Sequence, residues 1–189
     1  DRLLETAVAP SVEGCEGKIL EVCSLTPSTS FNLTRGDGNW RERMIIFAAL
    51  IEIPDLQHAY AELSDFFSNN VNNWLENTER FLENNLLNDS VVREFHQHLR
   101  KKVPDKVKKH CGIDLPNASW LDALLAELAL PKANATRFRA CIRSLMAQAC
   151  AGSLTADLFI LDEFQRFKAL LDSNQENEES LIAKKIFNK

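Results

Sequence analysis

Histidine and cysteine side chains could supply acid–base, nucleophilic or metal-binding chemistry to this chain. Three of the four histidines, His96, His98 and His110, lie close together in the sequence, and Cys111 follows His110. His96 and His98 are two residues apart, so on a helix they point to different sides and do not form the i, i+4 pair that binds a metal. The side chains of His110 and Cys111 diverge, and no third group orients them as a base and its nucleophile. The sequence therefore predicts no catalytic residue, no metal ligand and no cofactor.

The segment from residue 93 to residue 110 is the strongest electrostatic feature of the sequence. It contains seven cationic side chains against two acidic ones, whereas the whole chain has a net charge of −5. Clustered lysine and arginine side chains attract phosphates and acidic protein surfaces. The cations assigned to binding are Arg93, Arg100, Lys101, Lys102, Lys106, Lys108 and Lys109. A solvated helix face is the alternative interpretation, and the acidity of the whole chain argues against a dedicated nucleic-acid-binding protein.

Composition restricts the class of protein that the chain can form. The 189 residues are 45% hydrophobic and 26% charged, which is typical of one globular domain with a sizeable core. Six glycines and six prolines leave little material for the many turns of a sheet protein. No apolar run approaches the roughly 18 residues that a membrane-spanning helix needs. We therefore expect no transmembrane segment.

Cysteine usage and glycosylation signals bear on the cellular compartment. The five cysteines are an odd number without CxxC spacing, so we expect reduced thiols that pack as small apolar side chains. Four N-glycosylation sequons begin at Asn32, Asn88, Asn117 and Asn134. Three of them stand where a helix should begin, and asparagine is favoured there as a helix cap. We therefore favour a cytoplasmic protein, with a secreted glycoprotein as the alternative.

The elements that must position these side chains are helices. Apolar residues recur every three to four positions from Trp40 onward, which is the period of amphipathic helices. We therefore predict an all-α fold, a compact bundle of seven to nine helices, and no strand. The predicted organisation is an irregular segment with short helices at 1–36, a helical core domain at 37–173, and a polar linker with a short terminal helix at 174–189.

Helix-breaking and capping residues predict where individual helices begin and end. The polar residues 68–70 predict a break in the helical period. Pro104 predicts the end of a helix that starts near residue 89, and Ser119 predicts the start of another helix. A further helix is expected from Thr155 or Asp157 to residue 171. The predicted core consists of Trp40, Phe47, Leu63, Phe66, Trp74, Phe81, Trp120, Leu124, Phe138, Ile142, Phe164 and Phe167. Just before the helical period begins at Trp40, Gly36-Asp37-Gly38 predicts a turn. It is not a phosphate-binding loop, because it lacks the lysine of such a loop.

Two local motifs resemble the Bcl-2 family. Asn39-Trp40 leads into Arg43-Met-Ile-Ile-Phe-Ala-Ala, which is similar to the first homology motif of that family, and Asn73-Trp74-Leu-Glu-Asn77 is similar to its second motif. Arg41-Glu42 replaces the glycine of the first motif, and no glycine pair follows Trp74. The resemblance implies a bundle around a buried helix, with a groove for the amphipathic helix of a death-regulating partner. It also implies that Arg43 pairs with an acidic residue of that ligand.

These observations favour a non-enzymatic protein–protein interaction module, an adaptor, regulator or effector that binds its partner through a helical groove or the basic helix. Three alternatives stay open. The chain could be a Bcl-2-like apoptosis regulator, or it could bind an anionic nucleic acid or lipid through residues 93–110. It could also be an enzyme whose site is assembled from separated helices, around His98, His110 or Cys111. Oligomeric state is not indicated by the sequence.

Overall fold

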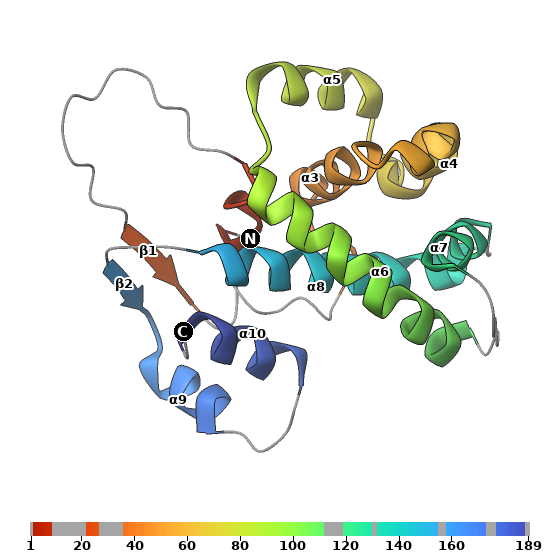
Figure 1. Cartoon of the computed structure of the whole chain (residues 1–189). Helices are drawn as coiled ribbons and strands as arrows, with labels where there is room; N and C mark the ends of the chain where they lie inside the picture. Colours follow the sequence, from red (N-terminus) through yellow and green to blue (C-terminus); the bar gives the residue numbers. More distant parts are fainter. Residues whose placement is uncertain are drawn as a thin grey trace.

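The computed structural model describes residues 2–8, 22–26, 36–111, 119–129, 132–154, 158–172 and 177–187 (Figure 1). Side chains are described in these ranges except at positions 2, 22, 105–111, 132–134 and 178. The described residues form nine α-helices, which confirms the predicted all-α bundle. The α-helices are α1 (Arg2–Glu5), α3 (Trp40–Ile51), α4 (Tyr60–Ser68), α5 (Trp74–Asn84), α6 (Asp89–Cys111), α7 (Trp120–Leu128), α8 (Lys132–Ser153), α9 (Phe164–Asp172) and α10 (Glu178–Phe187). A 3-10 helix spans Pro54–Ala59, and two strands span Val22–Leu25 (β1) and Leu158–Leu161 (β2).

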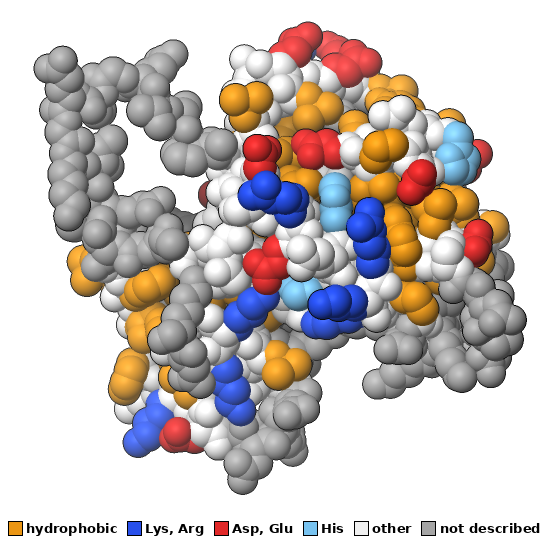
Figure 2. Space-filling view, in the orientation of Figure 1, with side chains coloured by type: hydrophobic (Ala, Val, Ile, Leu, Met, Phe, Trp, Pro, Cys, Tyr) orange, Lys and Arg blue, Asp and Glu red, His pale blue; other side chains and the backbone are white. Residues whose placement is uncertain are grey.

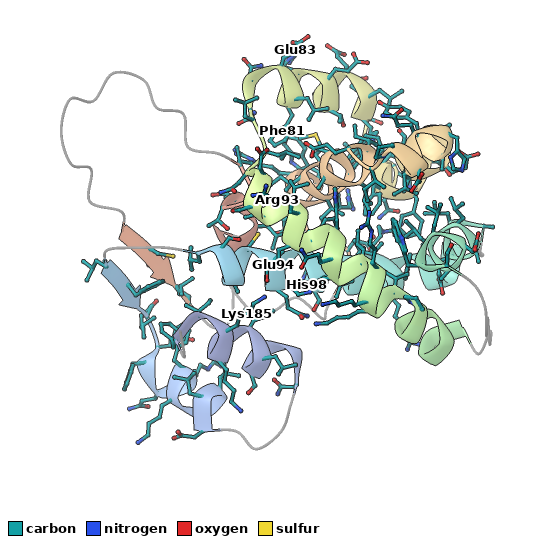
Figure 3. The ribbon with its side chains drawn as sticks, viewed as in Figure 1. Phe81, Glu83, Arg93, Glu94, His98 and Lys185 are labelled. Atoms are coloured by element: carbon teal, nitrogen blue, oxygen red, sulfur yellow. The ribbon has the colours of Figure 1, made fainter. Side chains whose placement is uncertain are left out.

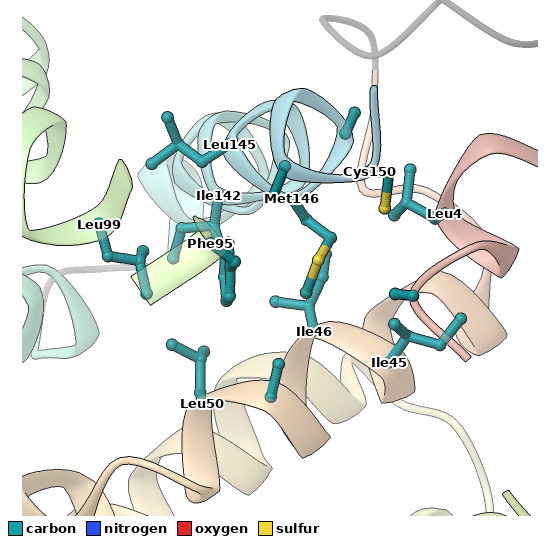
Figure 4. Packing of buried hydrophobic residues seen from close by; sticks show 14 of the residues in the cluster. Leu4, Ile45, Ile46, Leu50, Phe95, Leu99, Ile142, Leu145, Met146 and Cys150 are labelled. Atoms are coloured by element: carbon teal, nitrogen blue, oxygen red, sulfur yellow. The ribbon is translucent and has the colours of Figure 1, made fainter. Parts of the chain in front are cut away.

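Helices α3, α6 and α8 surround the centre of the core. Figure 4 shows Ile46 and Leu50 of α3, Phe95 of α6, and Ile142 and Met146 of α8 around one interior, and each is at most 1% exposed. Nine of the 12 residues of α3 are buried, so this helix is covered on nearly all sides. A helix that is apolar on most of its circumference is stable only inside a bundle, and α3 is therefore a central helix.

The beginning of the chain joins this core. In the short helix α1 and the turn after it, Leu3, Leu4 and Ala7 are each at most 1% exposed and belong to the same hydrophobic cluster as α3 and α8. The backbone N–H of Asn88 donates to the carbonyl of Ala7 at 2.7 Å, just before α6 begins. Residues outside the region of strong helical period therefore complete the bundle.

Most of the predicted core residues are buried, but two of these predictions are wrong. Trp40 is 49% exposed and Phe164 is 60% exposed. Each is the first residue of its helix, α3 or α9, and a helical Cα–Cβ bond tilts toward the N-terminus, so a side chain there projects beyond the bundle. Trp120, the first residue of α7, is only partly buried against the core.

The predicted helix end at Pro104 is also wrong, because α6 continues through this proline to Cys111. A proline inside a helix removes one backbone hydrogen bond and strains the preceding turn. Here α6 packs against both α7 and α8, and Leu99 and Val103 next to the proline are fully buried. Tertiary packing therefore outweighs the local cost of the proline.

The region 158–161 is a strand, whereas the sequence predicts a helix there and no strand in the chain. β2 pairs in parallel with β1, with Val22 opposite Leu158 and Leu25 opposite Leu161. The helix that follows, α9, begins only at Phe164. The prediction fails because the hydrogen-bonding partner of β2 lies more than 130 residues earlier in the chain, beyond the reach of any local pattern.

The break between α4 and α5 is confirmed at the polar residues 69 and 70. Asn69 and Asn70 both have positive φ, as does Asn73 before α5. Asparagine tolerates this left-handed conformation better than most residues, so these residues end one helix and redirect the chain into the next.

The sequence also predicts reduced thiols and no transmembrane segment. Cys141 and Cys150 are buried in α8, Cys23 is partly buried in β1, and none of these three described cysteines is in a disulfide. The side chains of Cys15 and Cys111 lie outside the described residues. Within the described ranges, no helix is both long enough and apolar enough to cross a membrane.

Candidate functional site

The basic segment predicted from the sequence, residues 93–110, lies entirely on α6. Arg93, Arg100 and Lys101 are exposed on its outer side, whereas Lys102 is half-buried and donates to Oε1 of Gln148 in α8. The side chains of Lys106, Lys108 and Lys109 lie outside the described residues. Figure 2 shows lysine and arginine side chains over α6, while acidic side chains gather over α5. The outer side of α6 is therefore a cationic surface on an acidic protein.

Local sequence and core packing fix the orientation of α6. Asn88 caps its first turn, because Oδ1 accepts from the N–H groups of Ser90 at 3.1 Å and Val91 at 3.4 Å. The opposite side of the helix is buried through five apolar residues: Val91, Val92, Phe95, Leu99 and Val103. Asn88 is one of the four predicted glycosylation sites; the side chains of the other three, Asn32, Asn117 and Asn134, lie outside the described residues.

We call Arg93, Gln97, Arg100 and Lys101 the basic face of α6. All four are exposed. The spacings between successive members are four, three and one residues, which places them on one side of the helix. No described acidic residue forms an ion pair with its three cations. The nearest acid in the sequence, Glu94, instead accepts from Nζ of Lys185 in α10 (Figure 3). The positive charge of the basic face is therefore not neutralised within the described part of the chain.

Two histidines flank the basic face, and both have lowered pKa values. His96 lies 2.7 Å through Nε2 from the carbonyl of Ala49, and burial together with the nearby Arg100 lowers its pKa despite this contact. His98 lies 3.4 Å from both Oε1 of Glu94 and Nζ of Lys185. Burial, followed by the charge of Lys185, lowers the pKa of His98 to about 4. Both side chains are therefore neutral at pH 7.

The contacts of His98 bear on the enzyme alternative. General acid–base catalysis is most efficient when the pKa of the group is close to the working pH, and a pKa of about 4 makes His98 a weak base. The side chains of His110 and Cys111 lie outside the described residues. Among described side chains, no group of three histidines, cysteines or acids could hold a metal ion.

Arg43, the residue that the Bcl-2 resemblance assigns to ligand binding, lies in a buried polar cluster. Its Nη1 is 3.9 Å from Oδ2 of Asp37, and its side chain is 9% exposed. Oδ2 of Asp37 also accepts from Nη2 of Arg139 at 2.8 Å. Burial raises the pKa of Asp37, but the hydrogen bond and charge of Arg139 outweigh burial, and the net change is a lowered pKa. Arg43 therefore already has an acidic neighbour inside the chain.

The turn predicted at Gly36-Asp37-Gly38 covers this cluster. Nη1 of Arg143 lies 3.6 Å from Oε2 of Glu42 below the turn. Gly38 has φ +75°, and a Cβ atom at this position would lie 2.3 Å from Oε2 of Glu42. The glycine thus allows the backbone to lie directly on a buried ion pair. Asn39 then starts α3, because its Oδ1 accepts from the N–H of Glu42 at 2.9 Å.

A pocket of about 280 Å³ lies beside the cluster, between α4 and α8. Its lining includes Glu62, Asp65 and Asn69 of the α4 end and Thr136 and Arg139 of α8. Among the described side chains, none of the binding residues predicted from the sequence lines it, and neither does any histidine or cysteine. The described lining therefore offers hydroxyl, amide and carboxylate groups, but no imidazole and no thiol.

The residues that sequence reasoning missed are those that join distant segments. Lys185 contacts Glu94 across 91 positions, and Arg139 contacts Asp37 across 102 positions. The i, i+4 spacing of Glu94 and His98 was a visible signal for part of one cluster. Nothing in the local sequence indicated the lysine that completes it.

Comparison with protein-family models, curated protein sequences and solved structures found no significant match.

Proposed function

We propose that this chain is a non-enzymatic protein–protein interaction module that binds an acidic protein segment through the basic face of α6. The observation that supports it is the absence of a described acidic partner for Arg93, Arg100 and Lys101, although all three are exposed on one side of a helix. Uncompensated cations on one surface attract carboxylates over several ångströms.

The spacing of the basic face suits a short acidic segment. Arg93 and Lys101 are eight residues apart, which is about 12 Å along the axis of an α-helix. Arginine can bind a carboxylate through two parallel hydrogen bonds, so Arg93 and Arg100 would each orient one acidic side chain. Gln97 lies between them as a neutral donor and acceptor. The described basic face carries no aromatic side chain on which unpaired bases could stack, which favours protein over single-stranded nucleic acid.

A photo-crosslinking amino acid at Gln97 tests the proposal directly. It sits in the middle of the basic face, so crosslinks formed in extracts of the native source should map to an acidic segment of one protein. The triple change Arg93→Glu, Arg100→Glu and Lys101→Glu should remove these crosslinks, because it replaces attraction by repulsion. Raising the salt concentration should weaken them in the unchanged protein.

A matched control reverses three exposed cations elsewhere. Arg41, Arg137 and Lys168 are exposed and, like the basic face, form no ion pair with a described acid. Their triple change to glutamate alters the net charge equally and should leave the crosslinks intact. Loss of crosslinks in both variants, or crosslinks that map to nucleic acid or lipid, would overturn the proposal. Circular dichroism of both variants verifies that the helices are retained.

A further inference from the structure

The C-terminal helix α10 is held on the bundle by an apolar side and one lysine. Ile182, Ala183 and Ile186 are at most 4% exposed, and α10 packs against α8 and α9. Between these apolar residues, Nζ of Lys185 donates to the carbonyl of Gln148 in α8 at 2.9 Å and to the carboxylate of Glu94 in α6. Lys185 thus joins α10 to two central helices at one point (Figure 3).

The carboxylate of Glu94 is closely confined at this point. A Cβ atom at Gly152 of α8 would lie 2.4 Å from Oε2 and 2.5 Å from Oε1 of Glu94. The carboxylate therefore occupies the space that a side chain at position 152 would need. It has little room to move if the charges around it change.

His98 is the third member of this cluster and faces Lys185. Its Nε2 is 3.4 Å from Nζ of Lys185, and its side chain is 17% exposed. The charged groups that act on it are Glu94, Lys101 and Lys102 of α6 and Lys185 of α10. The neighbouring Gln148 of α8 is neutral. Protonation of His98 would therefore place a second positive charge beside Lys185, with Glu94 as the one nearby carboxylate among the described side chains.

We propose that Lys185, Glu94 and His98 form an acid-sensitive latch, and that protonation of His98 releases α10 from α6 and α8. An isolated helix of ten residues is not stable in water, so release would also unfold α10. The three residues of the latch lie outside the basic face, and of that face only Lys101 acts on His98 through its charge, so the latch does not rest on the proposed binding function.

The direction of the pH effect follows from linkage. The pKa of His98 is lowered from 6.5 to about 4 in the docked state, so the docked state binds its proton less readily than the released state. Docking is then fully favourable above pH 6.5 and weakens as the pH falls toward 4. If the released state has an ordinary histidine pKa, the docking equilibrium constant falls by about 20-fold between pH 7 and pH 5.

Hydrogen exchange measured by mass spectrometry tests the latch. After correction for intrinsic exchange rates, protection of the amides of α10 should fall between pH 7 and pH 5 by about 20-fold. Protection of α3 should stay unchanged over the same range. His98→Gln removes the titrating group and should abolish the pH dependence in α10. The control His58→Gln changes an exposed histidine of the 3-10 helix and should keep it.

A second measurement keeps the proposal testable if the His98→Gln protein does not fold. The imidazole of His98 in the unchanged protein should titrate below pH 5 by NMR, at the lower end of the pH range over which α10 loses protection. Unchanged protection of α10 at pH 5, an equal pH effect in the His98→Gln protein, or titration of His98 near pH 6.5 would each overturn the latch.

Discussion

Two glycines in the turn before α3 allow a direct test of the buried polar cluster. Gly36 and Gly38 both have positive φ, of +70° and +75°. A Cβ atom at Gly36 would meet nothing within 4 Å, whereas at Gly38 it would lie 2.3 Å from Oε2 of Glu42 and 2.8 Å from Nη1 of Arg143. Changing each glycine to alanine therefore imposes a similar backbone strain, and only Gly38→Ala also disturbs the ion pair.

The two costs can be estimated separately. Alanine in the left-handed region costs about 1 kcal/mol, so Gly36→Ala should lower the free energy of unfolding by about that amount. At Gly38 the same strain applies, and the side chains of Glu42 and Arg143, both at most 8% exposed, must also move within a packed interior. Forcing atoms into such a site typically costs about 2 kcal/mol more. We therefore expect Gly38→Ala to destabilise the protein by about 3 kcal/mol.

Urea unfolding followed by circular dichroism gives both free energies from the midpoints and slopes. The difference between the two variants isolates the contact with the ion pair, because the backbone strain is common to both. If Gly36→Ala and Gly38→Ala destabilise the protein equally, within about 0.5 kcal/mol, then the turn does not lie on the Glu42–Arg143 pair as described.

Three other changes probe single features of the fold. Pro104→Ala should raise the free energy of unfolding by about 2 kcal/mol, because it restores a helical N–H inside α6; a lower melting temperature would contradict this. Ser119→Ala removes the capping box of α7 and should cost about 1 kcal/mol in urea unfolding, whereas an unchanged midpoint would contradict the cap. Burial raises the pKa of Cys150 to about 12, so peptide mapping after iodoacetamide treatment at pH 8 should find it unmodified in the native protein and modified in urea.

Helix-forming signals in the sequence were sufficient to predict most of the bundle. Ser119, the predicted start of α7, caps this helix by forming a capping box with Asp122, and Phe47, Phe81 and Phe138 lie on apolar stripes that are buried as predicted. These predictions succeed because capping and helical period depend on residues within one or two turns of each other.

Predictions failed where a distant segment decides the conformation. Leu158–Leu161 is a strand because Val22–Leu25 supplies its hydrogen bonds, and α6 passes Pro104 because packing on α7 and α8 supports it. Trp40 follows the helical period but is the first residue of α3, where the bundle does not cover it. These neighbours are distant in the sequence, so local sequence patterns do not predict them.

The sequence by itself determined that seven cations gather between residues 93 and 110, and that the part of this segment before Pro104 belongs to an amphipathic helix. Only the tertiary structure decided the environment of the individual charges. Arg93, Arg100 and Lys101 face solvent, Lys102 contacts Gln148, and Glu94 is bound by Lys185. The reason is that helical period fixes which side chains share a side of α6, whereas the charge left on that side depends on residues of α8 and α10 that meet it only after folding.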